Sequence, residues 1–294
     1  MKNPIYRSVV ELRAALGAGE ITATRIVDAH LEQIFVHNRA INALVTVDET
    51  GARESARESD EARARGEDPG PLHGIPFTVK DMFETKGLRT TNGHKPLANN
   101  IPERDATVVA RLREAGGTLL AKSNMPAQGM DIQCENALFG ATKNPWDLSR
   151  TPGGSTGGEA AALAAGMTPL GIGSDIGGSL RIPAHYCGVF ACKPTEGLVP
   201  RTGLLLPGTV NTVRHMVACG PMARSVADLR LALRIMAGPD GVDPSVVPVP
   251  LKEFPLRPLK DHRFAWTDDF GGLPVTASTR EAMEKLASDL RDAG

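Results

Sequence analysis

Hydrophobic positions along the chain follow two periods, one typical of helices and one typical of buried strands. From residue 8 to residue 35 the apolar side chains fall mostly three or four positions apart, which places them on one face of a helix. Ser8 stands before the first of these runs and Gly17 ends it, and both residue types are common at those helix ends. The same signals predict helices over 8–17, 24–35, 49–66, 107–115, 159–165, 226–236 and 278–292.

Short apolar runs between these helices predict strands. They cover 41–47, 74–81, 118–121 and 167–172, and such lengths suit strands better than helices. Polar or proline-rich stretches between the elements, at 123–150 and 239–262, are expected to be loops. Strands that alternate with helices favour a layered α/β fold.

Composition and charge exclude several classes of function. The 294 residues are enough for one large domain or two ordinary ones, and a net charge of -1 gives no attraction to nucleic acid or to an anionic membrane. No apolar run reaches the roughly 18 residues of a transmembrane helix. The four cysteines form no C-x-x-C pair and have no histidine cluster beside them, so we expect buried thiols, no metal and a cytoplasmic location.

Two glycine-rich turns carry the serines best suited to chemistry. The second turn, 174–179, reads Ser-Asp-Ile-Gly-Gly-Ser, and its glycines allow several N–H groups to point at one spot. An acyl-transfer enzyme needs such donors where negative charge develops on the substrate oxygen. Ser179 is therefore a candidate nucleophile, with an oxyanion hole formed by the N–H groups of Ile176, Gly177, Gly178 and Ser179. Taken alone, this turn is more simply explained as a structural one.

The first turn, 153–158, places Ser155 at the start of a predicted helix, where its hydroxyl could serve only as a cap. The glycine pairs on both sides exceed what a cap needs and indicate close backbone approach. The turn also fits the G-x-S-x-G pattern of a nucleophile elbow. That alternative requires a histidine base, and His185, His215 and His262 all lie in segments with no other sign of catalysis.

Lys80 ends an otherwise apolar strand, where a lysine usually reaches solvent or pairs with a carboxylate such as Asp81. To act as a base near neutral pH, it would need its pKa lowered by about 3 units, roughly 4 kcal/mol. Burial at a strand end beneath two glycine-rich turns is a plausible source of that shift.

Taken together, several segments resemble the amidase signature family over almost the whole chain. They are 74–81, 139–147, 150–158, 173–184, 187–188 and 193–195. The resemblance implies an α/β fold with a mixed β-sheet core covered by helices on both faces. It also implies a Ser–cis-Ser–Lys triad, in which Ser179 is the nucleophile, Ser155 follows a cis peptide bond and bridges, and Lys80 is the base.

The resemblance extends to the surroundings of the triad. It implies that Asp175 and Arg181 support the site, that Gly129 borders the substrate, and that no cofactor is used. Thr156 stands where the family usually has serine, and we assign it to the substrate-binding group. We expect one domain over 1–294, with a helical part at 1–70, a catalytic core at 71–240 and the start of a C-terminal part at 241–294. Because family members are considerably longer, we expect that last part to be incomplete.

These features predict an amidase that hydrolyses a small carboxamide through an acyl-enzyme on Ser179, in a chain that forms a homodimer. One alternative is the glutaminase-type subunit of a tRNA-dependent amidotransferase, which makes ammonia for a partner protein. Another is a truncated, non-catalytic family member. The segments Gly158-Glu159 and Asn124-Met125-Pro126 favour the free-standing amidase.

Overall fold

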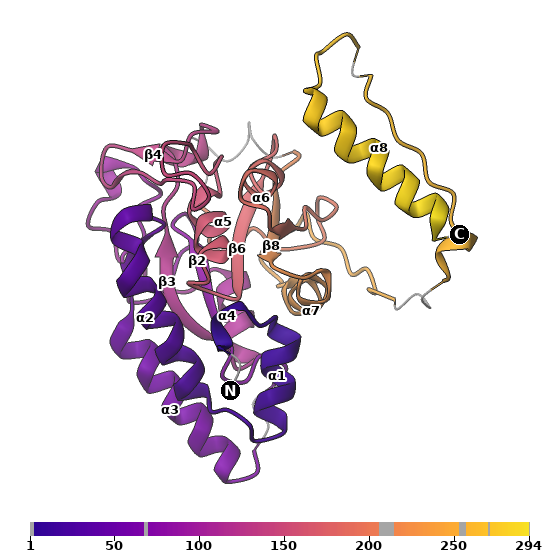
Figure 1. Cartoon of the computed structure of the whole chain (residues 1–294). Coiled ribbons are helices and arrows are strands. Elements are labelled where there is room, and N and C mark those ends of the chain that lie inside the picture. Colours follow the sequence, from indigo (N-terminus) through magenta and orange to yellow (C-terminus); the bar gives the residue numbers. More distant parts are fainter. Residues whose placement is uncertain (1–2, 68–69, 206–214, 253–256, 270, 294) are drawn as a thin grey trace. The chain divides into compact units, whose positions relative to one another are not determined.

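The computed structural model describes residues 3–67, 70–205, 215–252, 257–269 and 271–293 (Figure 1). The chain divides into two compact units, Met1–Val249 and Pro250–Gly294, and each is described by itself. The expected single domain over 1–294 and its three parts stay a prediction.

A six-stranded mixed sheet forms the centre of the first unit, in the order β1-β3-β2-β6-β8-β7. β2 runs parallel to both β3 and β6, whereas β1 with β3, β6 with β8 and β7 with β8 are antiparallel. Because parallel neighbours end at the same edge of a sheet, the carboxyl ends of β2 and β6 come together there. The strands are β1 Leu44–Val47, β2 Pro76–Lys80, β3 Thr118–Ser123, β6 Leu170–Asp175, β7 Phe190–Ala191 and β8 Ala218–Ala223, with a separate pair β4 Glu135–Asn136 and β5 Gly140–Ala141.

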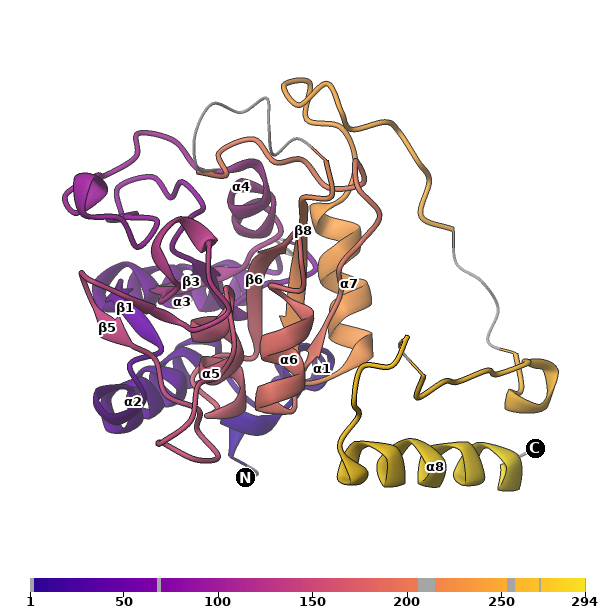
Figure 2. The same cartoon turned by 90° about the horizontal axis from the view of Figure 1, so that it is seen from above.

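Helices cover both faces of this sheet, as expected: α5 and α6 lie on one side of β6 and α4 lies on the other (Figure 2). Ser8 caps α1 through a capping box with Glu11, and Thr22 caps α2, which fixes where both helices begin. The helices are α1 Val9–Gly17, α2 Ala23–Ile41, α3 Glu49–Ala64, α4 Thr107–Glu114, α5 Gly157–Ala164, α6 Arg181–Cys187 and α7 Val226–Met236, with short 3-10 turns η1 Pro4–Tyr6, η2 Lys95–Leu97 and η3 Ala127–Gly129.

The predicted elements of this unit are present, with some corrections to their bounds. The strand predicted over 41–47 begins only at Leu44 because α2 continues to Ile41. The strand predicted over 167–172 is shifted toward the C-terminus and becomes β6. The periodicity did not predict α6, β7 or β8. The stretch 123–150, which was expected to be a loop, contains η3 and the short strands β4 and β5.

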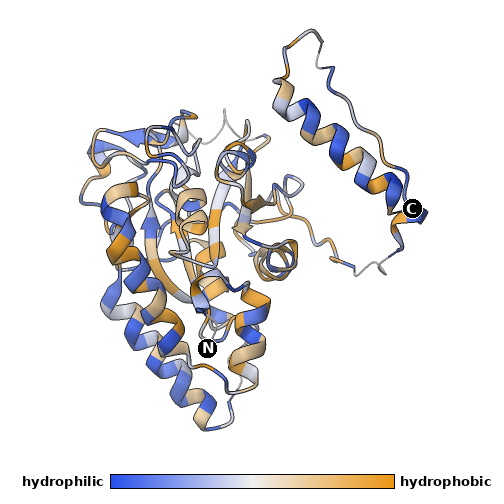
Figure 3. Ribbon diagram, in the orientation of Figure 1, coloured by the Kyte–Doolittle hydropathy of each residue, from blue (hydrophilic) through white to orange (hydrophobic). Residues whose placement is uncertain are grey.

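The buried helix α5 begins within the first glycine-rich turn, at Gly157. All seven residues from Gly157 to Leu163 are buried, and the helix contacts β1, β2, β3, β6 and β8. Small side chains permit this close approach: a Cβ on Gly158 would lie 2.5 Å from the carbonyl oxygen of Asn124. By contrast, the outer helices α2 and α3 carry both hydrophilic and hydrophobic residues, as Figure 3 shows.

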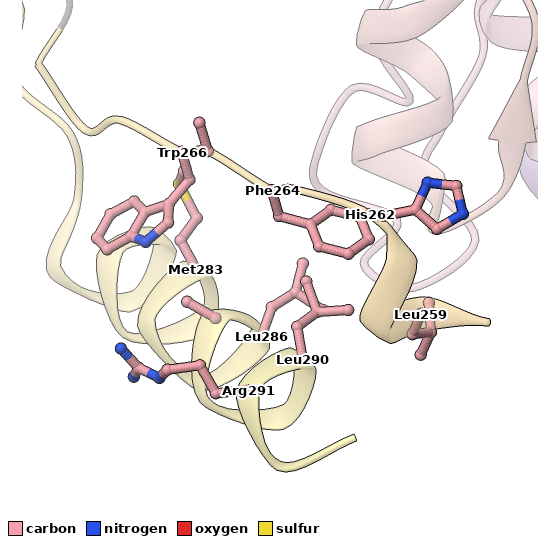
Figure 4. Close-up of a pocket in the computed structure, with 10 residues that line it drawn as sticks. Leu259, His262, Phe264, Trp266, Met283, Leu286, Leu290 and Arg291 are labelled. Atoms are coloured by element: carbon pink, nitrogen blue, oxygen red, sulfur yellow. The ribbon is translucent and has the colours of Figure 1, made fainter. Parts of the chain in front are cut away.

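The second unit contains η4 Leu259–Asp261 and α8 Ala277–Asp292. Phe264 and Trp266 lie against the apolar side of α8, at Met283 and Leu286 (Figure 4). A cavity of about 480 Å³ lies between them, and the described residues that line it include no serine, cysteine or lysine. This cavity therefore does not hold the serine and lysine side chains expected at the catalytic site. In neither unit do the described helices include one long and apolar enough to cross a membrane.

Candidate active site

Lys80, the last residue of β2, is completely buried. Its Nζ lies 2.6 Å from Oγ of Ser155 and 3.2 Å from Oγ of Ser174. Burial lowers the pKa of Lys80 from 10.5 to about 7, although nearby groups that include Asp175 and Glu159 oppose the shift. The neutral amine, which is the form able to accept a proton, is therefore accessible near pH 7.

Ser155 follows a cis peptide bond from Gly154, as the family resemblance implies. Its side chain is buried beside Lys80. A Cβ on Gly154 would lie 2.9 Å from the carbonyl oxygen of Asp131, so this position has room only for glycine. Close backbone approach is thus the reason for at least one of the glycines around Ser155.

Asp175 organises the second glycine-rich turn, immediately after β6. Its carboxylate accepts hydrogen bonds from the N–H groups of Gly178 at 2.9 Å and Leu180 at 3.0 Å, and from the guanidinium of Arg181 at 2.8 and 3.1 Å. Burial raises the pKa of Asp175, but the hydrogen bonds from Arg181 and the backbone outweigh it and lower the pKa. The carboxylate of Asp175 therefore holds the backbone of the turn in place.

A cavity of about 330 Å³ opens between the two turns and holds both candidate serines in its lining. No hydrogen bond joins Oγ of Ser155 to Oγ of Ser179 in the described part of the chain. The described lining residues are Met82, Gln128, Gly129, Met130, Asp131, Ile132, Ser155, Ser174, Ile176, Gly177, Ser179 and Val217. Gly129, which is expected to border the substrate, is one of them.

Gly178 and Thr156, two of the residues expected to bind the substrate or its oxyanion, form hydrogen bonds within the protein instead. The N–H of Gly178 donates to Asp175, so it is not available as an oxyanion donor. Thr156 is fully buried and lies outside the cavity lining: its hydroxyl donates to the carbonyl oxygen of Ser174 and its N–H to that of Ser179. Its role here is to connect the two turns. In the part of the chain that the structure describes, no protein acceptor uses the N–H groups of Ile176, Gly177 and Ser179.

The nucleophile-elbow alternative lacks a histidine base among the residues that the structure describes. No histidine occurs among the described residues that line the cavity. His185 and His215 are exposed, and His215 pairs with Glu196, while His262 belongs to the second unit. Within the described ranges, no three His, Cys, Asp or Glu side chains gather to hold a metal ion.

Sequence reasoning missed two buried ionisable residues next to the site. Glu159 accepts a 2.5 Å hydrogen bond from Thr78 on β2, and burial raises its pKa to about 8. Lys122 on β3 donates to the carbonyl oxygen of Phe83 and lies 3.7 Å from Asp81. Lys122 offered the same signal as Lys80, a lysine near the end of an apolar strand, whereas Glu159 looked like an ordinary residue in the first turn of a helix.

Sequence and structure comparisons show which family the chain belongs to. The amidase family model matches residues 25–294. A glutamyl-tRNA(Gln) amidotransferase subunit of Roseiflexus castenholzii is 42% identical over 92% of this chain and 53% of that protein. An acylamidase of Rhodococcus erythropolis is 39% identical over 99% of this chain and 62% of that protein.

Solved structures give the same result. A fatty acid amide hydrolase superposes with a TM-score of 0.93 at 27% identity, over 100% of this chain and 53% of that one. The chain thus spans about half the length of several curated relatives it matches. The family model matches residues 25–294, and the two relatives are 42% and 39% identical to the chain over 92% and 99% of its length, so the chain belongs to the amidase signature family.

Proposed function

We propose that this chain carries the catalytic centre of an amidase, with Ser179 as nucleophile, Ser155 as relay and Lys80 as base. The observation that carries the proposal is the 2.6 Å contact between the buried Lys80 amine and Ser155, beside a cavity that Ser155 and Ser179 share. A lysine with its pKa near 7 can exchange a proton at physiological pH, whereas an ordinary lysine is almost fully charged there.

In the first half of the reaction, Oγ of Ser179 attacks the amide carbonyl carbon while its proton passes to Ser155 and the proton of Ser155 passes to Lys80. The two serine hydroxyls approach each other in the substrate complex, since catalytic hydrogen bonds often tighten only there. The N–H groups of Ile176, Gly177 and Ser179 stabilise the oxyanion. The C–N bond then breaks, and the proton returns along the same relay to the leaving nitrogen.

In the second half, water attacks the acyl-enzyme ester on Ser179. Lys80 again removes a proton through Ser155. The C–O bond of the ester then breaks, this proton returns through Ser155 to Oγ of Ser179, and a carboxylic acid leaves. The turn at 176–179 serves the same oxyanion in both halves, because the carbonyl oxygen keeps its place.

Labelling with a fluorophosphonate tests the nucleophile. Wild-type protein is expected to gain the label on Ser179, located by mass spectrometry of peptides, and the labelling rate should rise through pH 7 as Lys80 loses its proton. Hydrolysis of a panel of aliphatic, aromatic and amino-acid amides then identifies the substrate class. Folded protein that stays unlabelled at every pH would favour the non-catalytic alternative.

A glutaminase is the second candidate, because several similar relatives are named as subunits of a glutamyl-tRNA(Gln) amidotransferase. The lining of the cavity favours a less polar substrate, since Met82, Met130, Ile132 and Val217 contribute much of it. Glutaminase activity together with a co-purifying second protein would support the amidotransferase. Hydrolysis of aliphatic or aromatic amides by the isolated chain would support the amidase.

The homodimer and the cytoplasmic location belong to the same proposal. Light scattering coupled to size-exclusion chromatography distinguishes one copy of the 31.1 kDa chain from two. Fractionation of the producing cells tests the location. Neither property is required for the relay, which lies within one chain.

A further inference from the structure

Ser174 lies near the carboxyl end of β6, within hydrogen-bond distance of Lys80. Neither the family resemblance nor the motif analysis gave it a role. We propose that Ser174 is a positioning residue that fixes the direction of the hydrogen bonds around Lys80, so that the lone pair of the neutral amine faces Ser155. The inference rests on the proposed amidase function and adds a fourth side chain to its relay.

The placement of Ser174 follows from the topology of the sheet. β2 and β6 are parallel neighbours, so residues near their carboxyl ends are side by side. Ser174 is buried, with a relative exposure of 6%, and its Oγ lies 3.2 Å from Nζ of Lys80 and 3.0 Å from Sδ of Met82. It therefore touches the base on one side and a wall of the cavity on the other.

The chemistry of these three groups determines which of them donates. A thioether sulfur carries no hydrogen and can only accept, so the hydroxyl of Ser174 donates to Met82. A hydroxyl has a single hydrogen, so toward Lys80 the oxygen of Ser174 can only accept. One N–H of the neutral amine is thereby directed at Ser174.

A neutral amine has one lone pair, and this arrangement leaves it for Ser155. If Ser174 were free to rotate, its hydroxyl could donate to Lys80 and occupy the lone pair that must receive the relay proton. Met82 prevents this by holding the hydroxyl hydrogen. After proton transfer, Ser174 still accepts from the new ammonium, and a hydrogen bond to a charged donor is stronger than one to a neutral donor.

Other ionisable groups around Lys80 are unchanged by a substitution at Ser174. They are Cys134 in the loop after β3, Glu159 on α5, Asp175 at the end of β6 and Cys219 on β8. Each of them raises the pKa of Lys80, and burial, which lowers it, remains the largest influence. A change in the pH dependence of a Ser174 variant therefore reports the loss of this one hydroxyl.

Ser174→Ala is expected to lower kcat roughly tenfold to hundredfold, the range for losing one hydrogen bond to a charged group, with little change in KM. The acid limb of the pH profile should move to lower pH, because the ammonium form of Lys80 loses an acceptor. Ser174→Thr keeps the hydroxyl and should restore most of the rate. Met82→Leu keeps the apolar wall but frees the hydroxyl of Ser174, and should also slow the reaction.

The decisive measurement is the rate of fluorophosphonate labelling of Ser179 as a function of pH, in wild type and in these variants. It needs no knowledge of the natural amide. Ser59→Ala is the matched control, because Ser59 is a buried serine of α3 whose hydroxyl donates to the carbonyl oxygen of Ser55, away from the relay. Circular dichroism confirms that each variant is folded.

The outcomes distinguish the positioning role of Ser174 from the amidase activity itself. Slower labelling and a shifted acid limb in Ser174→Ala, with recovery in Ser174→Thr and no effect of Ser59→Ala, support the positioning role. If wild type is labelled, and Ser174→Ala has the same labelling rate and the same acid limb of the pH profile, the positioning role is overturned. The amidase proposal then stays intact. A threonine variant as slow as the alanine variant overturns the positioning role as well. A wild type that never labels overturns both.

Discussion

Replacing Lys80 by methionine is expected to stabilise the fold near neutral pH while it abolishes turnover. Burial lowers the pKa of Lys80 from 10.5 to about 7, so folding at pH 7.5 must remove a proton that the unfolded chain keeps. At about 1.4 kcal/mol per unit, this costs the folded protein about 4 kcal/mol. Methionine avoids that cost but loses the contacts with Ser155 and Ser174, an offset of about 2 kcal/mol. The net gain in unfolding free energy is about 2 kcal/mol.

Urea unfolding at several pH values tests this prediction, with the exposed Lys143→Met as a control. Between pH 7 and 10.5 the unfolded wild type binds more protons than the folded one, so wild-type stability rises with pH. The advantage of the methionine variant should therefore shrink as the pH rises. Lys122, whose pKa burial lowers to about 8, is present in both proteins and cancels. A variant that is less stable at pH 7.5, or a difference that does not change with pH, would refute a neutral buried amine.

Three further predictions concern the turns and the helix between them. Ser179→Ala should remove both turnover and fluorophosphonate labelling, whereas replacing any of the seven histidines should leave the rate of amide hydrolysis unchanged. Gly158→Ala should lower the unfolding free energy by about 3 kcal/mol in urea titrations, because the new Cβ would lie 2.5 Å from the carbonyl oxygen of Asn124; unchanged stability would contradict the close packing of α5. Asp175→Asn should lower kcat roughly tenfold to hundredfold, and Arg181→Ala should cost less because the side chain of Arg181 is 56% exposed; the reverse order would show that the backbone contacts of Asp175 matter little.

Sequence periodicity predicted the helices and strands whose apolar residues follow a regular helical or strand pattern. It did not predict buried elements that contain proline or glycine. β8 contains Gly220 and Pro221 in its middle, residues that normally argue against a central strand. It is nevertheless fully buried and pairs with β6 along its whole length. α6 was missed for a similar reason, since it contains Pro183.

Sequence motifs were enough to predict which residues are candidates for catalysis. Lys80, Ser155 and the turn at 174–179 stood out because glycine pairs and a charge at the end of an apolar strand are unusual. The use of the N–H of Gly178 by Asp175, and the contact of Ser174 with Lys80, depend on how the turn folds back on itself and on which strands are neighbours. The spacing of residues along the chain predicts neither the hydrogen bond from Gly178 to Asp175 nor the contact between Ser174 and Lys80.

The pairing of β2 with β6 has a consequence for how the protein acquires activity. Lys80 and Ser174 touch although they are 94 positions apart, and contacts between such distant segments form late because closing a long loop costs entropy. A nascent chain with β6 still inside the ribosome therefore has a lysine that lacks its contact with Ser174. During refolding, recovery of the labelling rate should coincide with the closure of the central strands rather than with the earlier formation of helices.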